Sequence, residues 1–321
     1  MVGTVFLAFA LWRHRLCAAA HLGSLFARAV GGGAGVKRTR HYFFGTMFLG
    51  AVFGRLRGRA LDAAEMQRFA NLAALAGFFD DLVDSTPPPH FSREAGGGVE
   101  SYGRSADPSG LALRLLQQAY TDVPALHAEA FRENLLRVFQ IETDGRQRKQ
   151  PAPNEVEIGR LTAEKGGCSV LLFRYLLTDE LSVAEQRAIF EFGHFVQRCD
   201  DIFDLWHDRQ SGTATLATVW AGQGDLVQLE VQFERQVAVV EAALRDIPVS
   251  AKRRETAIQT VFFLVAVTRV CLRHYCWLQK KHGTLPLENR RRMVVDMARW
   301  KFQLRVVAEL FAFRKSLKTT L

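Results

Sequence analysis

Apolar residues recur along most of the chain at intervals of three and four residues, which is the spacing of amphipathic helices. The strict alternation typical of a half-buried strand is almost absent. One such stripe predicts a helix over residues 62–84 and consists of Leu72, Leu75, Phe78, Phe79 and Leu82. The same spacing predicts further helices over residues 111–121, 124–147, 154–178, 182–209, 224–246, 251–282 and 286–316. The pattern therefore predicts an all-α protein.

One stretch, residues 86–110, interrupts the helical pattern. It contains three consecutive prolines, then Gly96-Gly97-Gly98, then Asp107-Pro108, and all of these favour turns. We expect a mobile surface loop there. The chain otherwise shows neither a linker nor a repeat, and 48% of its 321 residues are hydrophobic, enough for a sizeable core. We therefore expect one helical domain over residues 1–321.

The charge balance favours an anionic partner. The formal net charge is +9, which suits a diphosphate or an acidic membrane surface. Because no basic patch is interleaved with aromatic residues, nucleic acid is not an expected partner. Five cysteines without a CxxC pair indicate a reduced, cytoplasmic protein. The apolar segment 1–12 is shorter than the ~20 residues a membrane span needs, so we expect a core helix there, with peripheral membrane contact as the alternative.

The first candidate site is Asp80-Asp81-Leu82-Val83-Asp84, at the end of the predicted helix 62–84. On a helix, Asp80, Asp81 and Asp84 lie at about 0°, 100° and 40° around the axis and share one face. Three neighbouring carboxylates repel one another and destabilise the helix unless a cation joins them. An acidic helix end facing solvent is the alternative interpretation.

The second candidate site repeats this arrangement at Asp200-Asp201-Ile202-Phe203-Asp204. Asp208 continues the same helical face, and Gln197 precedes the motif on that face. Carboxylate oxygens suit Mg²⁺, which binds few of them and keeps water and phosphate oxygens in its shell. Two such helices facing each other across a cavity would hold a metal cluster bridged by a diphosphate.

Other segments occur around these motifs in a fixed order. A basic segment, Lys37-Arg38-Thr39-Arg40, precedes Asp80 by about 40 positions. Lys165-Gly166-Gly167 and Gln197 precede the second motif, and Gly212-Thr213-Ala214-Thr215-Leu216 follows it. In this order the chain resembles the trans-isoprenyl (polyprenyl) diphosphate synthases of the class I isoprenoid synthase superfamily. The resemblance runs from residue 37 to residue 216.

The resemblance implies a single-domain helical bundle around a central cavity, which releases diphosphate from a prenyl diphosphate substrate. It implies Mg²⁺ as the cofactor, as a cluster of up to three ions with bound diphosphate. The implied metal ligands are Asp80, Asp81, Asp84, Asp200, Asp201, Asp204 and Asp208. The implied diphosphate-binding residues are Lys37, Arg38, Arg40 and Lys165. Lys165 and Gln197 are the implied catalytic residues, and a homodimer is compatible with the sequence.

The residues expected to line the cavity are Ala76, Gly77, Phe79, Gly166 and Gly167. Ala76 and Gly77 are small and lie one turn before the first motif, where residues of such synthases limit the product chain. We therefore expect a deep cavity. Gly166 and Gly167 inside a helix cost ~1 kcal/mol each. A helix break there would turn backbone carbonyls towards the cavity, and a plain helix end is the alternative.

One departure separates the chain from the chain-elongating synthases, which have paired arginines soon after the first motif. Here Asp84 is followed by Ser85-Thr86 and three prolines, and Arg93 stands alone. We expect Mg²⁺-dependent ionisation of an allylic prenyl diphosphate followed by prenyl transfer. The alternative is a class I terpene cyclase that makes a hydrocarbon or alcohol. A second alternative is a non-catalytic isoprenoid-binding member of the fold.

Overall fold

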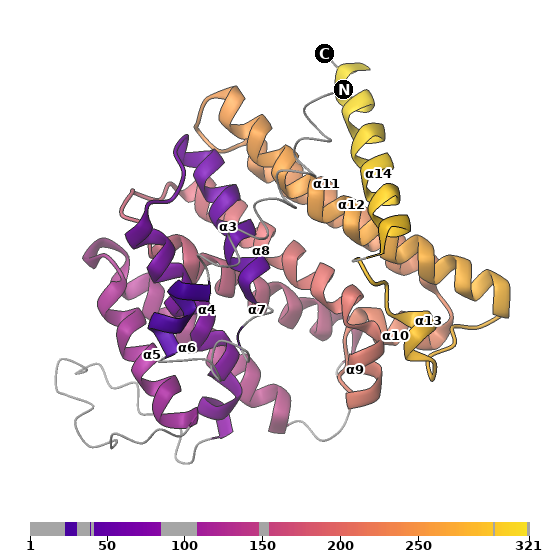
Figure 1. Ribbon diagram of the computed structural model, residues 1–321, viewed down its shortest axis with the longest axis horizontal. Coiled ribbons are helices and arrows are strands. Elements are labelled where there is room, and N and C mark those ends of the chain that lie inside the picture. The colour runs from indigo at the N-terminus through magenta and orange to yellow at the C-terminus, as the bar shows by residue number, and fades with distance from the viewer. Residues whose placement is uncertain are drawn as a thin grey trace. The chain divides into compact units, whose positions relative to one another are not determined.

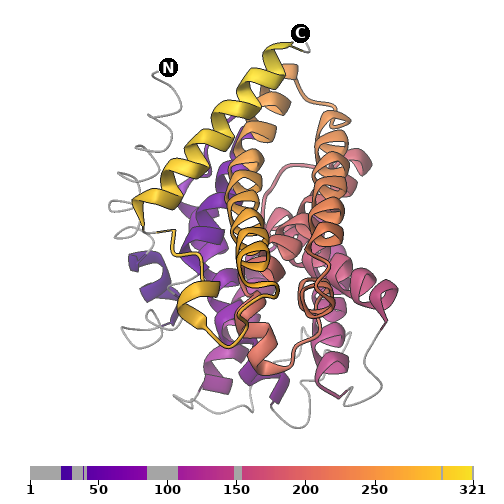
Figure 2. The same ribbon diagram turned by 90° about the vertical axis from the view of Figure 1, so that its right-hand side faces the viewer.

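The computed structural model describes residues 23–30, 39, 42–84, 108–147, 154–297 and 299–319. Within these ranges the chain is helical and contains no strand, which confirms the all-α class. Residues 23–30 form a short helix before the labelled elements. The N-terminal segment 1–12, expected to be a core helix, lies outside the described residues. Figures 1 and 2 show the helices of each part of the chain in two views.

The labelled helices are α3 (Tyr42–Arg57), α4 (Ala63–Asp84), α5 (Pro108–Asp122), the 3₁₀ turn η1 (Ala125–His127), α6 (Ala128–Gln147), α7 (Glu155–Tyr175), α8 (Val183–Phe203), α9 (Leu205–Ser211), α10 (Leu216–Gln223), α11 (Leu226–Arg245), α12 (Ala251–His282), α13 (Arg290–Met293) and α14 (Trp300–Thr319). They belong to two compact units, and helix α7 contributes to both. Unit 1 comprises residues 1–12, 148–167 and 182–321, and unit 2 comprises 13–147 and 168–181. The single domain expected from the sequence stays a prediction.

Unit 2 is built on α4, which packs against α3, α5 and α6. Its buried apolar residues include Phe69, Leu72, Leu75 and Phe78, which recur at helical spacing. The aromatic ring of Phe69 meets Phe53 and Phe173 edge to face, at centroid distances of 6.0 and 5.3 Å. These aromatic contacts tie α3, α4 and the end of α7 into one core.

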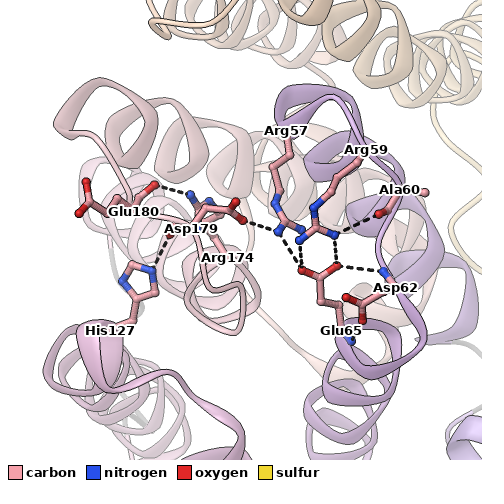
Figure 3. A network of polar contacts seen from close by, with 9 residues as sticks. All are labelled: Arg57, Arg59, Ala60, Asp62, Glu65, His127, Arg174, Asp179 and Glu180. Carbon is pink, nitrogen blue, oxygen red and sulfur yellow. Dashed lines mark hydrogen bonds and ion pairs between the residues drawn. The ribbon is translucent and has the colours of Figure 1, made fainter.

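A buried ion-pair network also holds unit 2 together (Figure 3). Glu65, with 1% of its side chain exposed, accepts two hydrogen bonds from Arg59, at 2.7 and 2.9 Å. The Arg57 guanidinium lies 2.8 Å from Glu65 and also pairs with Asp179. Buried Arg174 donates to the Asp179 carbonyl at 3.2 Å. The turn that follows α7 is thereby fastened to the α3–α4 turn.

Unit 1 is centred on α8, α11 and α12, whose apolar faces form its core. Phe195 of α8 and Phe233 of α11 place their ring centroids 5.9 Å apart. Arg269 of α12 holds Glu234 of α11 through two hydrogen bonds of 2.7 Å. Helix α14 packs against α12 and buries Phe302 with its neighbours against it. The second acidic motif therefore lies on a helix fixed by two others.

Most predicted helix boundaries agree with the structure to within a few residues, and α12 spans residues 251–282 as expected. The single helix expected over residues 286–316 is wrong, because α13 ends at Met293 and α14 begins at Trp300. The loop expected over residues 86–110 ends earlier than predicted, since α5 begins at Pro108, a residue suited to a first helical position. Residues 85–107 lie outside the described part.

Helix α12 is long and apolar enough by composition to cross a membrane, and it alone qualifies among the described helices. However, 61% of its most apolar 18-residue stretch is buried inside the protein. That burial is what a central core helix shows, and α12 contacts α8, α11 and α14.

Candidate functional site

The second acidic motif lies where α8 passes into α9. Asp200 and Asp201 are in the last turn of α8, and Asp208 is in α9. Asp204 stands at the junction, where its backbone N–H donates to the Asp200 carbonyl at 2.8 Å. The N–H of Asp208 donates to Asp204 in the same way, also at 2.8 Å. Helical hydrogen bonding therefore continues across the junction and keeps the carboxylates on neighbouring turns, as the sequence spacing predicts.

Neighbouring polar groups hold these carboxylates. The Gln197 amide donates to Asp201 at 3.0 Å and to Asp200 at 3.4 Å. The hydroxyl of Thr162, on α7, lies 3.5 Å from the other oxygen of Asp201. The Tyr275 hydroxyl donates to the Ile202 carbonyl at 3.1 Å and ties α12 to the motif's backbone. Gln197 thus orients two carboxylates at once.

The electrostatics of the motif are unfavourable without a cation. Burial, together with the charges of Asp204 and Asp201, raises the pKa of Asp200 to about 6. Asp200 retains surface open to solvent, yet protein atoms surround it closely enough to restrict its hydration. Burial and the other three carboxylates raise the pKa of Asp208 to about 7, and burial raises the pKa of Asp201. The positive charge of Lys165 opposes all three shifts.

Lys165 owes its place beside the motif to a close crossing of α7 and α8. A Cβ atom added to Gly166 would collide with the Gly193 carbonyl oxygen and would lie 2.6 Å from Gln197 Cβ. A Cβ added to Gly193 would likewise lie 2.8 Å from Gly167 Cα. Only glycine allows two backbones to approach this closely. The crossing sets the register of Lys165 against the acidic motif.

The glycine pair does not break its helix, because α7 runs without interruption from Glu155 to Tyr175. The expected break at Gly166 and Gly167 is therefore wrong. At both glycines, atoms of α8 occupy the space that a Cβ would need, and at Gly167 these atoms belong to the Phe190 ring. Their role in this structure is close packing, and a cavity lined by them stays a prediction.

The segment Gly212–Leu216 contains the turn between α9 and α10. Gly212 has a φ of +75°, the left-handed conformation that glycine adopts readily, and it ends α9. Thr215 caps α10 by accepting from the Thr218 N–H at 3.2 Å, while the Thr218 hydroxyl accepts from the Thr215 N–H at 2.9 Å. The glycine and threonine of this segment thus shape the chain directly after Asp208.

The first acidic motif forms the end of α4, so its helical placement is confirmed. The side chains of Asp80, Asp81 and Asp84 lie outside the described part, as do Lys37, Arg38 and Arg40. Their predicted roles stay predictions.

The three cavity residues predicted before the first motif differ in their surroundings. Ala76 is exposed, and its carbonyl accepts from the Tyr42 hydroxyl at 3.3 Å. A Cβ added to Gly77 would lie 2.8 Å from the methyl group of Thr39. Phe79 is half-buried and meets Phe139 edge to face at 5.9 Å. Gly77 therefore allows close packing within unit 2, and a cavity role for these residues stays a prediction.

The donor set of the second motif fits Mg²⁺ by chemistry, since it offers only carboxylate oxygens. Among the residues whose side chains are described, no three His, Cys, Asp or Glu side chains surround a common point.

Sequence reasoning missed three residues of this site. Thr162 contacts Asp201 from a different helix, and Gly193 is the partner that Gly166 requires. Arg198 follows Gln197, and its positive charge opposes the rise in the pKa of Asp201. Gly193 could have been found, because a glycine inside an apolar helix usually marks a close approach. No sequence pattern points to Thr162, because its contact with Asp201 depends on how α7 crosses α8.

Comparisons of the chain with protein-family models, curated proteins and solved structures found no match.

Proposed function

We propose that this protein binds Mg²⁺ through its acidic motifs and ionises an allylic prenyl diphosphate, followed by prenyl transfer. The observation that carries the proposal is the crowding of Asp200, Asp201 and Asp208 beside Lys165. Burial is the largest cause that raises the pKa of these three carboxyl groups, and the positive charge of Lys165 offsets only part of the shift. Such a site gains stability from a cation and then from the anion that the cation recruits.

Lys165 and Gln197 each have a physical role in this proposal. Bound Mg²⁺ would supply charge neutralisation as negative charge builds on the leaving diphosphate. Lys165 would bind the same diphosphate by charge-assisted hydrogen bonds. Gln197 keeps Asp200 and Asp201 oriented, so these ligands need not reorganise during the reaction. The first motif, with Asp80, enters the proposal from the sequence alone.

The second candidate is a terpene cyclase, and one observation favours it. The elongating synthases bind a second diphosphate through arginines placed soon after the first motif. This chain has Ser85-Thr86-Pro87 there instead. A cyclase needs no second diphosphate and loses nothing by that difference. A non-catalytic isoprenoid-binding protein is the third possibility, and it predicts binding without diphosphate release.

Product analysis distinguishes these functions. The protein is incubated with Mg²⁺ and geranyl, farnesyl or geranylgeranyl diphosphate, each with and without isopentenyl diphosphate. A longer diphosphate that forms only with isopentenyl diphosphate identifies a transferase. A hydrocarbon or alcohol formed from the allylic substrate alone identifies a cyclase. Absence of diphosphate release from all three substrates would contradict catalysis on this substrate class.

Variants of both motifs test the metal assignment. Asp80→Ala and Asp200→Asn should each lower turnover by at least a hundredfold. Each substitution removes a proposed ligand of Mg²⁺, whose charge would stabilise the transition state. Asp246→Asn, at the exposed end of α11, is the matched control and should retain full turnover. Near-normal turnover of the motif variants would refute the metal site.

The proposal extends to the cellular location of the protein and to its oligomeric state. A cytoplasmic enzyme with a prenyl diphosphate substrate needs no membrane span, and most of α12's apolar stretch is buried within the protein. Peripheral membrane contact and a homodimer stay predictions. Analytical ultracentrifugation of the full chain measures the second directly.

A further inference from the structure

A cavity of about 160 Å³ lies in unit 1, between residues of the last turns of α12, of α13 and of the start of α14. Figure 1 labels these three helices. The volume is ample for several water molecules or one small anion. His274, Trp277, Leu278 and Lys281 line it from α12. These residues are three and four positions apart, so they share one face of that helix. Tyr275 instead points to α8 and the acidic motif, so the cavity is a separate feature of the same helix.

The described side chains that line this cavity include many cations and no acidic group. The cations are Lys281, Arg291, Arg292, Arg299 and Lys301. Asp296 pairs with Arg299 at 3.5 Å across the exposed surface, which offsets one charge. The first turn of α14 adds no acidic residue. Like charges gathered around one cavity repel one another, and an anion inside it would relieve that repulsion.

Aromatic rings give the cavity a defined wall. The Lys281 ammonium lies 4.8 Å from the centroid of the Trp277 ring, and the Lys301 ammonium 5.1 Å from that of Phe302. His274 stacks on Trp277 at 6.0 Å and meets Phe302 edge to face at 5.6 Å. These contacts restrict two flexible lysine side chains, so less entropy is lost when an anion binds.

The backbone fixes the arginine side of the cavity. Asn289 is the N-cap of α13, and its side chain accepts a hydrogen bond from the Arg292 N–H at 3.2 Å. The Arg292 carbonyl lies 2.7 Å from Nε2 of His274. Burial and the charges of Arg305 and Lys301 lower the pKa of His274, although its bond with this carbonyl opposes the shift. The local field is therefore positive where α12 and α13 meet.

We propose that this cavity binds an anion of one or two phosphoryl groups, independently of the function proposed above. Arginine guanidinium groups match phosphate oxygens in pairs, and lysine adds point charges. Two sources share this chemistry, namely free phosphate or diphosphate and the phosphomonoester headgroup of a lipid. Trp277, Trp300 and Leu304 are exposed nearby, at 51%, 73% and 58%, which suits a lipid surface.

Calorimetric titration of the full chain with inorganic phosphate and inorganic diphosphate tests the free-anion source. EDTA is present, so that the acidic motifs cannot recruit diphosphate through Mg²⁺, and the salt concentration is physiological. The cavity variant is Lys281→Gln with Arg292→Gln. The matched control is Lys252→Gln with Arg253→Gln, which removes two exposed charges from the first turn of the same α12. Both pairs change the net charge equally.

The second arm tests the lipid source with vesicles. Phosphatidylcholine vesicles contain either phosphatidic acid, a phosphomonoester, or phosphatidylglycerol, a diester, at equal surface charge. A preference for phosphatidic acid that disappears in the cavity variant and persists in the control identifies a lipid headgroup. Saturable binding of a free anion without such a preference identifies a soluble ligand.

The expected result in either arm is that the cavity variant binds at least tenfold more weakly, while the control stays within twofold of the wild type. Circular dichroism verifies that the substituted proteins are folded, as expected for changes at exposed side chains. Trp277→Phe supplies an independent variant, which should remove a ligand-induced change of tryptophan fluorescence. Equal affinities of the cavity variant and the control, or the absence of wild-type binding in both arms, would overturn the proposal.

Discussion

The buried carboxyl group of Glu65 makes the stability of the fold depend on pH. Burial alone would raise the pKa of its carboxyl, but hydrogen bonds from Arg59 and Arg57 and from the Asp62 backbone lower it to about 2. A carboxyl with a lowered pKa in the folded state stabilises the fold above its unfolded pKa, near 4.5. That stabilisation is lost as the pH falls from about 4.5 towards 2.

We predict that Glu65→Gln lowers the free energy of unfolding at pH 7 by roughly 3 kcal/mol, since it removes one of the two carboxylates that pair with the buried Arg57 guanidinium. The variant should also lose much of the wild type's decrease in stability between pH 4.5 and 2. Urea unfolding across this pH range measures both effects. Glu129→Gln removes an exposed ion pair with Arg132 and should change stability by less than about 1 kcal/mol. Equal effects of the two substitutions would disprove the energetic role of burial.

A substitution of Gln197 should affect metal binding rather than stability, because Gln197 contacts the proposed metal ligands and not the core. Gln197→Leu keeps most of the volume but removes the donor to Asp200 and Asp201. We expect the Mg²⁺ concentration for half-maximal activity to rise about tenfold, as for lost outer-shell partners at other metal sites. Gln186→Leu, at the exposed start of α8, is the control. An unchanged Mg²⁺ requirement would contradict the orienting role.

At the scale of elements, the α7–α8 crossing depends on glycine. We predict that Gly166→Ala destabilises the protein by about 1–3 kcal/mol or more, because its Cβ would collide with backbone that cannot move aside easily. Gly159→Ala, on the same helix, meets only Leu216 at 3.7 Å and should be neutral or stabilising by up to ~1 kcal/mol. Thermal unfolding of the two variants gives the comparison. Destabilisation by both substitutions alike would remove the argument for a close crossing.

Helix propensity and caps made several elements predictable from sequence. Asn154 and Ser182 are residue types that favour the N-cap position, and each accepts from the backbone N–H three residues later, at 2.9 and 3.2 Å. The break between α13 and α14 was not predictable, because no glycine or proline marks it. There the chain leaves the helix at Val294, with ψ of 119°, and Val295 and Met297 pack against the α12–α14 core. Tertiary burial overrides local helix preference in this segment.

The candidate site was predictable to the extent that its spacing is local. Asp200, Asp201, Asp204 and Gln197 share one helix face because helical geometry dictates it. The contact from Thr162 and the collision that excludes a Cβ at Gly166 depend on a crossing between helices that are distant in sequence. Periodicity specifies which face is buried, but it leaves open which residues of two buried faces meet.

At the scale of the whole molecule, the two units share α7, which passes from unit 1 to unit 2 after Gly167. We therefore predict one cooperative unfolding transition. All five tryptophans fall within the residue ranges of unit 1, so tryptophan fluorescence reports on that unit. Glu65→Gln, in unit 2, should shift the fluorescence midpoint and the circular dichroism midpoint together. A shift in circular dichroism alone would show that the units unfold separately.

The close approach of Gly166 and Gly193 has a consequence for how the chain tolerates mutation. In a library of all single variants sorted by cellular abundance, substitutions at these two positions should be depleted, because they disturb packing whether or not the protein is active. Substitutions at Asp200 should be retained or enriched in the same sort, since a neutral side chain relieves carboxylate crowding. When the library is instead sorted by activity, Asp200 should become as intolerant as the glycines. Comparing the two sorts would distinguish residues that are needed for folding from residues that are needed only for activity.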